Sequence, residues 1–174
     1  REVRARLLEP IGLETTWYQA EEKPRITGTR AYRLVEAGDG TLRPVPVAGR
    51  SNVMPFRSVV TAAAGAGSIA ATASDAARWM QAFGGGEVLT EEMQADMIAD
   101  VSRTAELNAL QPYGLGIQAL PIANRYALGH SGRFLGFRNV VRYLPGEGMS
   151  IAVLTNQGVK DPARIAEALL KVVL

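Results

Sequence analysis

Residues 128–173, LGHSGRFLGFRNVVRYLPGEGMSIAVLTNQGVKDPARIAEALLKVV, decide the fold that we expect for this chain. Two runs rich in Val, Ile, Leu, Phe and Tyr, 136–144 and 149–155, lie on either side of Pro145-Gly146-Glu147-Gly148. Such residues favour strands, and a short turn between two strands is typical of an antiparallel hairpin. Asp161-Pro162 then provides an N-cap followed by proline at the first helical position, which predicts the start of a terminal helix.

Two shorter runs upstream, 114–119 and 125–130, predict two further strands, so the last third of the chain is expected to form an antiparallel sheet. The terminal helix is expected over 162–173. We expect one apolar stripe of this helix to face the sheet, formed by Ile165, Ala168, Leu169 and Val172. An antiparallel sheet covered by a helix is an α+β arrangement.

The first part of the chain indicates helices and loops. Residues 1–9 predict a short amphipathic helix, and helices are expected after the N-caps Thr72 and Thr90. Residues 28–36 and 41–47 predict two extended segments joined by a Gly-Asp-Gly turn, the second of which contains prolines and is suited to an edge.

The 174 residues, 47% of them hydrophobic, fit one ordinary domain. Within it we expect 1–110 to be mostly a helical and loop portion of a subdomain, and 111–174 to hold the antiparallel strands and the C-terminal helix. No run of about 18 apolar residues is present to span a membrane. The chain has no cysteine, which excludes disulfides, iron–sulfur clusters and a thiol nucleophile.

Charge and ligand types exclude further classes of function. The net charge is +2, and the 16 Arg and three Lys residues are scattered, so we expect no nucleic-acid partner. One histidine without cysteine cannot form the usual zinc site. Gly65-Ala66-Gly67 lacks the lysine of a phosphate-binding loop. We therefore expect neither a metal nor a cofactor.

The single histidine, His130, is followed by Ser131 and Gly132. A Ser–His catalytic pair is disfavoured here, because neighbouring residues on a strand point to opposite faces. The nucleophile-elbow pattern Gly-x-Ser-x-Gly also fails, since residue 133 is Arg. From the pattern alone, the alternative is a polar turn at the end of a strand.

Five segments in the same order and with similar spacing resemble the C-terminal half of the serine β-lactamase-related family, which includes class C β-lactamases, DD-peptidases, D-aminopeptidases and certain esterases. These segments are REVRARLLEPIGLETT (1–16), GAGSIAATASDAARW (65–79), EVLTEEMQADM (87–97), YGLGIQ (113–118) and LGHSGRFLGFRNVVRYLPGEGMSIAVLTN (128–156). The resemblance implies a β-lactamase/transpeptidase-like fold, with an antiparallel sheet, a C-terminal helix and part of a helical subdomain. This chain would be a fragment of it.

The family's active site has three motifs, and His130-Ser131-Gly132 resembles the third, Lys-Thr-Gly or His-x-Gly. The resemblance implies that this strand lines the cleft and that its edge pairs with an extended substrate. It also implies that the backbone N–H of Arg133 is one of two oxyanion donors. A histidine, unlike a lysine, can be neutral at pH 7.

The other two motifs are missing from the sequence. None of Lys23, Lys160 and Lys171 follows a serine by three residues, and neither Tyr-x-Asn nor Ser-x-Asn occurs. We therefore expect the isolated chain to be inactive, as part of a serine hydrolase that attacks amide or ester bonds through an acyl-enzyme. Its partners would be a small-molecule or peptide substrate and the N-terminal half of the same fold. The resemblance favours a periplasmic or secreted location, with a cytoplasmic one possible.

The alternative function is a non-enzymatic binding module, which captures a peptide or partner along the strand that carries His130.

Three more residues are candidates for binding the substrate. Asp161-Pro162-Ala163-Arg164 resembles the Asn-Pro-Ala-Arg that follows the last strand of class C β-lactamases, which implies roles for Asp161 and Arg164. Asn156 ends the preceding predicted strand and is a weaker candidate. An N-cap followed by proline explains Asp161-Pro162 equally well without any ligand.

Overall fold

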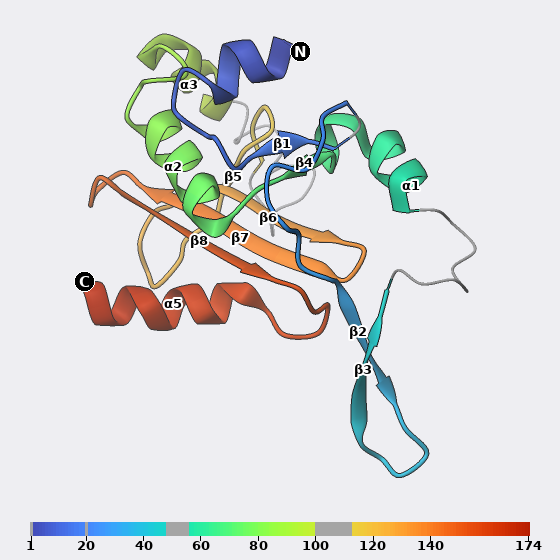
Figure 1. Cartoon of the computed structure of the whole chain (residues 1–174). Coiled ribbons are helices and arrows are strands. Elements are labelled where there is room, and N and C mark those ends of the chain that lie inside the picture. The colour runs from blue at the N-terminus through green and yellow to red at the C-terminus, as the bar shows by residue number, and fades with distance from the viewer. Residues whose placement is uncertain (1, 20, 48–55, 100–112) are drawn as a thin grey trace.

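A computed structural model of the chain describes residues 2–19, 21–47, 56–99 and 113–174 (Figure 1). Its centre is an antiparallel four-stranded sheet in the order β5-β6-β7-β8. The strands are β5 (Gln118–Ala119), β6 (Leu128–Phe134), β7 (Phe137–Leu144) and β8 (Met149–Thr155). The predicted hairpin across residues 145–148 is confirmed as β7 and β8, with Leu144 opposite Met149.

Two helices cover opposite faces of this sheet, as Figure 1 shows: α2 (Ala73–Gly84) and α5 (Pro162–Val173). Alternate residues of β7 point to opposite faces. Val140 and Leu144 are buried in a cluster with α5, whereas Val141 and Tyr143 pack on a cluster that includes α2. The helix α2 therefore packs directly on the sheet. The boundary that we expect at residue 110 lies outside the described residues and stays a prediction.

The helix α5 has the predicted bounds and the predicted N-cap, since Asp161 accepts a hydrogen bond from the backbone of Ala163. The prediction that this apolar stripe faces the sheet is wrong. The buried residues are instead Pro162, Ala166 and Leu170. Ile165, Leu169 and Val172 are 42%, 50% and 85% exposed. The helix has two apolar faces, and the one with the smaller side chains packs against the sheet.

The strands around His130 differ from the prediction. The expected strand over 114–119 is reduced to the two residues of β5, and the expected strand over 125–130 runs instead from Leu128 to Phe134. The chain turns at Leu135 and Gly136, which both have positive φ, 46° and 84°. Such a two-residue turn matches the twist of the flanking strands, so the hairpin continues up to it. A polar turn at a strand end is therefore the wrong interpretation of residues 130–132.

The remaining elements precede α2 or follow it. They are η1 (Arg4–Leu8), β1 (Trp17–Tyr18), β2 (Tyr32–Glu36), β3 (Leu42–Pro46), α1 (Phe56–Ala63), η2 (Ala64–Ala66), β4 (Ile69–Ala70) and α3 (Glu91–Ala99). β1 pairs with β4, and the predicted hairpin of β2 and β3 is confirmed and extends away from the sheet in Figure 1. Thr72 and Thr90 accept the capping hydrogen bonds predicted for them, from Asp75 and Met93.

A buried arginine holds the N-terminal segment together. Arg4 is 9% exposed and donates to the carbonyl oxygens of Leu13 and Thr16. Its guanidinium also binds Glu22 through two hydrogen bonds, of 2.8 and 2.9 Å. These bonds from Arg4 are the main cause that lowers the pKa of the Glu22 carboxyl to about 2. Folding is therefore linked to the ionisation of this carboxyl.

We expect acid to weaken this link in a defined pH window. The pKa of Glu22 is lower in the folded chain than its ordinary 4.5, so its stabilisation is complete above pH 4.5 and is lost as the pH falls toward 2. Between pH 5.5 and 3 the free energy of unfolding should fall by about 2 kcal/mol more in the wild type than in Glu22→Gln. Urea unfolding at both pH values measures this difference. Glu2→Gln, which removes an exposed partner of Arg6, should behave as the wild type does; equal pH dependence in Glu22→Gln would contradict the assignment.

Close packing of α2 on the sheet gives a second expectation. A Cβ on Gly84 would lie 2.3 Å from two ring carbons of Tyr143. Gly84→Ala should therefore lower the free energy of unfolding by about 1 to 3 kcal/mol, as overpacking does. Gly38→Ala is the control, because nothing lies within 4 Å of its added Cβ and the change should stay within about 0.5 kcal/mol. Urea midpoints compare the two, and equal midpoints would contradict direct packing of α2 on β7.

Candidate active site

The predicted motif lies on a strand edge that is largely open. β6 pairs with β5 only at Leu128 and Gly129. Within the described part of the chain, no strand covers the outer edge of β6 from His130 to Phe134. His130, Ser131 and Arg133 are exposed there, and Gly132 is half-buried. The structure thus brings the four predicted catalytic residues together on one accessible edge.

The direction of one hydrogen bond fixes the orientation of this edge. The backbone N–H of Ser131 donates to Oε1 of Gln118, which belongs to β5, at 2.9 Å. It therefore points to the outer edge of β6. Because backbone groups of alternate strand residues point to the same edge, the N–H of Arg133 points outward as well. This is the direction that an oxyanion donor at Arg133 requires.

His130 is held by two contacts. Its Nδ1 lies 2.7 Å from the carbonyl oxygen of Ser131, and its Nε2 lies 2.9 Å from the hydroxyl oxygen of Tyr113. A carbonyl oxygen can only accept, so Nδ1 carries the hydrogen, and in a neutral ring Nε2 accepts from the tyrosine. The two rings meet edge to face, with centroids 5.4 Å apart. Sequence reasoning missed Tyr113, although this residue opens the segment YGLGIQ.

Behind the edge lies a buried polar pair that sequence reasoning also missed. Arg142 is 3% exposed and Gln118 is 8% exposed. Arg142 Nη2 donates to Oε1 of Gln118 at 3.0 Å and to Oγ of Ser131 at 2.7 Å, and Nη1 donates to the carbonyl of Val141. Burial lowers the pKa of Arg142 to about 10, so the side chain stays charged at neutral pH. A charged residue between Val141 and Tyr143, in an otherwise apolar run, was the available signal.

The structure gives Asn156 a structural contact. Its side-chain amide donates to the carbonyl oxygen of Arg30 at 2.9 Å, and its own carbonyl accepts from the backbone of Tyr32 at 2.8 Å. Asn156 therefore ties the end of β8 to the start of the β2–β3 hairpin. The side-chain nitrogen and the main-chain carbonyl of Asn156 are thus used in holding these segments together.

Asp161 and Arg164 lie away from His130. Asp161 caps α5 and lies 3.4 Å from the guanidinium of Arg138, and Arg164 is exposed on the same helix. The helix covers the face of the sheet that bears Val140, whereas His130 stands opposite Val141 and shares its face. The structure thus does not bring these two residues together with His130.

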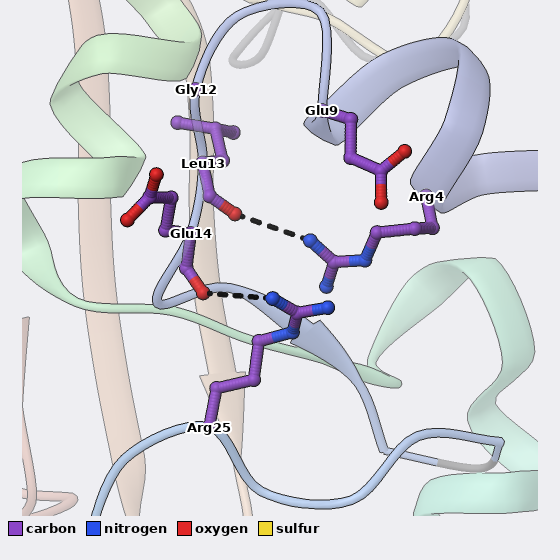
Figure 2. A pocket seen from close by; sticks show the side chains of 6 residues that line it. All are labelled: Arg4, Glu9, Gly12, Leu13, Glu14 and Arg25. Carbon is purple, nitrogen blue, oxygen red and sulfur yellow. Dashed lines mark hydrogen bonds between the residues drawn. The ribbon is translucent and has the colours of Figure 1, made fainter.

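A hollow in the N-terminal segment is a separate feature (Figure 2). Its volume is about 490 Å3, and the residues that line it are Arg4, Glu9, Gly12, Leu13, Glu14 and Arg25. Two of its four charged side chains donate to main-chain carbonyls, Arg4 to Leu13 and Arg25 to Glu14. None of the lining residues belongs to β6. Arg4 and Arg25 thus hold the loop of Leu13 and Glu14 in place, and the hollow is separate from the strand edge that carries His130.

Within the described ranges, no cluster of three or more His, Asp or Glu residues could hold a metal ion. No helix in those ranges has the length and apolar character needed to cross a bilayer.

Comparison with known families assigns the chain. The family model described as Beta-lactamase matches residues 1–174, its whole length. The chain belongs to the beta-lactamase family. The resemblance inferred from the five sequence segments and the β-lactamase/transpeptidase-like fold are thereby confirmed. A search of curated protein sequences found no match.

Solved structures of the same fold resemble this beta-lactamase-family chain at low sequence identity. A D-amino acid amidase from Ochrobactrum anthropi SV3 is 19% identical with a TM-score of 0.71, covering 99% of this chain and 51% of that one. The octameric penicillin-binding protein homologue from Pyrococcus abyssi is 18% identical, with a TM-score of 0.68 and coverage of 99% and 36%. A D-stereospecific amidohydrolase from Streptomyces sp. is 21% identical, with a TM-score of 0.66 and coverage of 95% and 46%. The chain thus spans about one third to one half of the length of these proteins.

The contacts of Asn156 separate a structural role from substrate binding. Asn156→Ala should lower the free energy of unfolding by about 1 kcal/mol, because the hydrogen bond to Arg30 is lost. It should leave the His130 and Arg133 amide resonances unchanged by NMR, because its contacts lie with Arg30 and Tyr32 and not with β6. Arg164→Ala, on an exposed surface, should change neither quantity, with stability within about 0.5 kcal/mol. A shift of the Arg133 amide resonance at full stability in Asn156→Ala would contradict a purely structural role.

Proposed function

We propose that this chain is part of a serine hydrolase that cleaves amide or ester bonds through an acyl-enzyme. In this proposal the chain supplies the substrate-binding strand β6 and one oxyanion donor, and the nucleophile comes from another part of the fold. The observation that carries the proposal is the open edge of β6, with the N–H of Arg133 directed outward beside His130. The family assignment supports it, and amide substrates are favoured by the similar fold of two amidohydrolases.

The geometry of this edge suits acyl transfer. When a serine attacks a carbonyl, negative charge develops on the carbonyl oxygen, and a fixed N–H donor stabilises that charge by roughly 3 kcal/mol. The N–H of Arg133 is fixed by the pairing of β6 with β7, in which Arg133 stands opposite Arg138. His130 is held next to it by Tyr113 and can donate or accept at the same edge.

Two surfaces of the chain are suited to contact with the N-terminal half of the fold. β8 lies at the end of the sheet order, so its outer edge carries no strand among the described residues. Beside it, Leu154 is 39% exposed, and α5 presents the stripe of Ile165, Leu169 and Val172 to solvent. We infer that a strand and a helix of the N-terminal half of the fold cover these surfaces, since an exposed apolar stripe next to an open edge is typical of a contact site.

The same open edge also supports the alternative of a non-enzymatic module that binds a peptide by strand addition. The two candidates differ in what the edge needs. A hydrolase needs the single N–H at Arg133, whereas strand addition needs several consecutive backbone groups.

Acylation and binding tests examine the proposal in the purified chain. Nitrocefin and p-nitrophenyl esters should not be hydrolysed, and a fluorescent penicillin should leave no adduct, because no nucleophile motif is present. D-Phenylalanine amide should shift the Arg133 amide resonance. Arg133→Pro, which removes the outward N–H without touching the ladder to β7, should weaken that binding about tenfold, measured at the Phe134 amide because proline has no N–H, and Arg133→Ala should not.

Each contrary outcome has a definite meaning. A covalent adduct on Ser131 would overturn the assignment of the nucleophile to another part of the fold. Equal binding of the ligand by Arg133→Pro and the wild type would refute the donor role. Micromolar affinity for long peptides of many sequences, with none for the amide, would favour the binding module.

A further inference from the structure

The edge of β6 is open to solvent, yet the backbone N–H and carbonyl of one of its residues already form hydrogen bonds to side chains of the same chain. Residues of β6 that point outward occur at every second position, at 129, 131 and 133. Gly129 is covered by its partner Gln118 in β5. Ser131 has no strand partner on this side, but both of its backbone groups are bonded: the N–H to Gln118 Oε1 at 2.9 Å, and the carbonyl to His130 Nδ1 at 2.7 Å.

The side chain of Gln118 can reach Ser131 because of a row of three residues across the sheet. Gln118 stands opposite Gly129, and Gly129 stands opposite Arg142. Since the middle residue has no side chain, the side chains on either side meet above it, with Arg142 Nη2 3.0 Å from Gln118 Oε1. A Cβ on Gly129 would lie 2.0 Å from the carbonyl oxygen of Val141, so the row requires glycine at this position.

Burial keeps this arrangement in place. Gln118 and Arg142 are 8% and 3% exposed, and the described residues include no carboxylate in an ion pair with Arg142. A ligand that displaced Gln118 from Ser131 would leave a buried cation with fewer hydrogen bonds, which is costly in a low-dielectric interior. Gln118 therefore occupies the position at Ser131 that the carbonyl of an added strand would take.

We propose that Gln118, positioned by Arg142, restricts the site to acyl donors of single-residue length, such as amino-acid amides or esters. With Ser131 closed, Arg133 is the remaining outward residue of β6, and it offers one N–H and one carbonyl. An extended peptide needs a second pair of backbone groups two residues away to add as a strand. This inference rests on the proposed function, because it takes Arg133 as the point where the substrate carbonyl binds.

The closure itself is tested without any ligand. By NMR hydrogen exchange, the Ser131 amide of the wild type should exchange at least tenfold more slowly than the Arg133 amide. Gln118→Leu, which keeps volume and removes the acceptor, should abolish this protection. Gln118→Glu, which keeps an acceptor for both Ser131 and Arg142, should preserve it. Unchanged exchange at Val140 and Val153 shows that the sheet is intact in each variant, and equal protection of Ser131 in Gln118→Leu would overturn the closure.

The substrate class is tested with two probes, D-phenylalanine amide and diacetyl-L-lysyl-D-alanyl-D-alanine. In the wild type, the tripeptide should bind no more than about twofold more tightly than the amide. In Gln118→Leu the affinity for the tripeptide should rise about three- to tenfold, which is the effect of one or two backbone hydrogen bonds, and the affinity for the amide should not change. Gln118→Glu should behave as the wild type.

The outcomes distinguish a failure of the substrate restriction from a failure of the proposed function. Two results would overturn the restriction to single residues and leave the proposed function standing. One is a wild type that binds the tripeptide about three- to tenfold more tightly than the amide. The other is an equal gain in affinity for both probes in Gln118→Leu. If neither probe moves the Arg133 amide in any variant, the proposed function fails and takes the substrate assignment with it, whatever the exchange data show for Ser131.

Discussion

The burial of β7 on both faces is the constraint on which the rest of the structure depends. Val140 and Leu144 lie against α5, and Val141 and Tyr143 lie toward α2. Arg142 is the one charged residue inside this apolar run and cannot reach solvent. Its guanidinium therefore has to find acceptors within the sheet, and it finds them above Gly129, at Gln118 and Ser131. The positions of Gln118 and Ser131 in the candidate site therefore follow from the hydrogen bonds that the buried Arg142 requires.

The parts of the fold that the sequence predicts well depend on local signals. The Pro-Gly-Glu-Gly turn, the caps at Thr72, Thr90 and Asp161, and the bounds of α5 all result from short-range chemistry. The face that α5 buries could not be predicted in the same way. Both faces of the helix are apolar, and the choice between them depends on how closely the helix can approach β7 and β8, which small residues such as Ala166 allow.

The candidate site likewise contains features that local sequence patterns predict and features that depend on tertiary packing. The motif His130-Ser131-Gly132 and the outward N–H of Arg133 follow from a family pattern and from strand alternation. The contact of Tyr113 with His130, and the row from Gln118 to Arg142, depend on strand register over separations of 17 and 24 residues. Register is set by tertiary packing, so these partners become visible only once the sheet is assembled. Asn156 is a different case, because a polar residue at a strand end can bind another loop as well as a ligand, and its role in substrate binding stays a prediction.

The buried charge also bears on the chemistry proposed for the edge. The pKa of Arg142, about 10, lies well above neutral pH, so the guanidinium remains a cation behind Ser131. Arg133 follows Ser131 by two residues, roughly 7 Å along an extended strand. Because Arg142 is bonded to the Ser131 hydroxyl and is 3% exposed, its charge acts on the site more strongly than an exposed charge would. In the proposed hydrolase, an anionic intermediate bound at the N–H of Arg133 would therefore form in a field that is already positive. Arg142, which positions Gln118 against long substrates, would thus also favour the reaction of short ones.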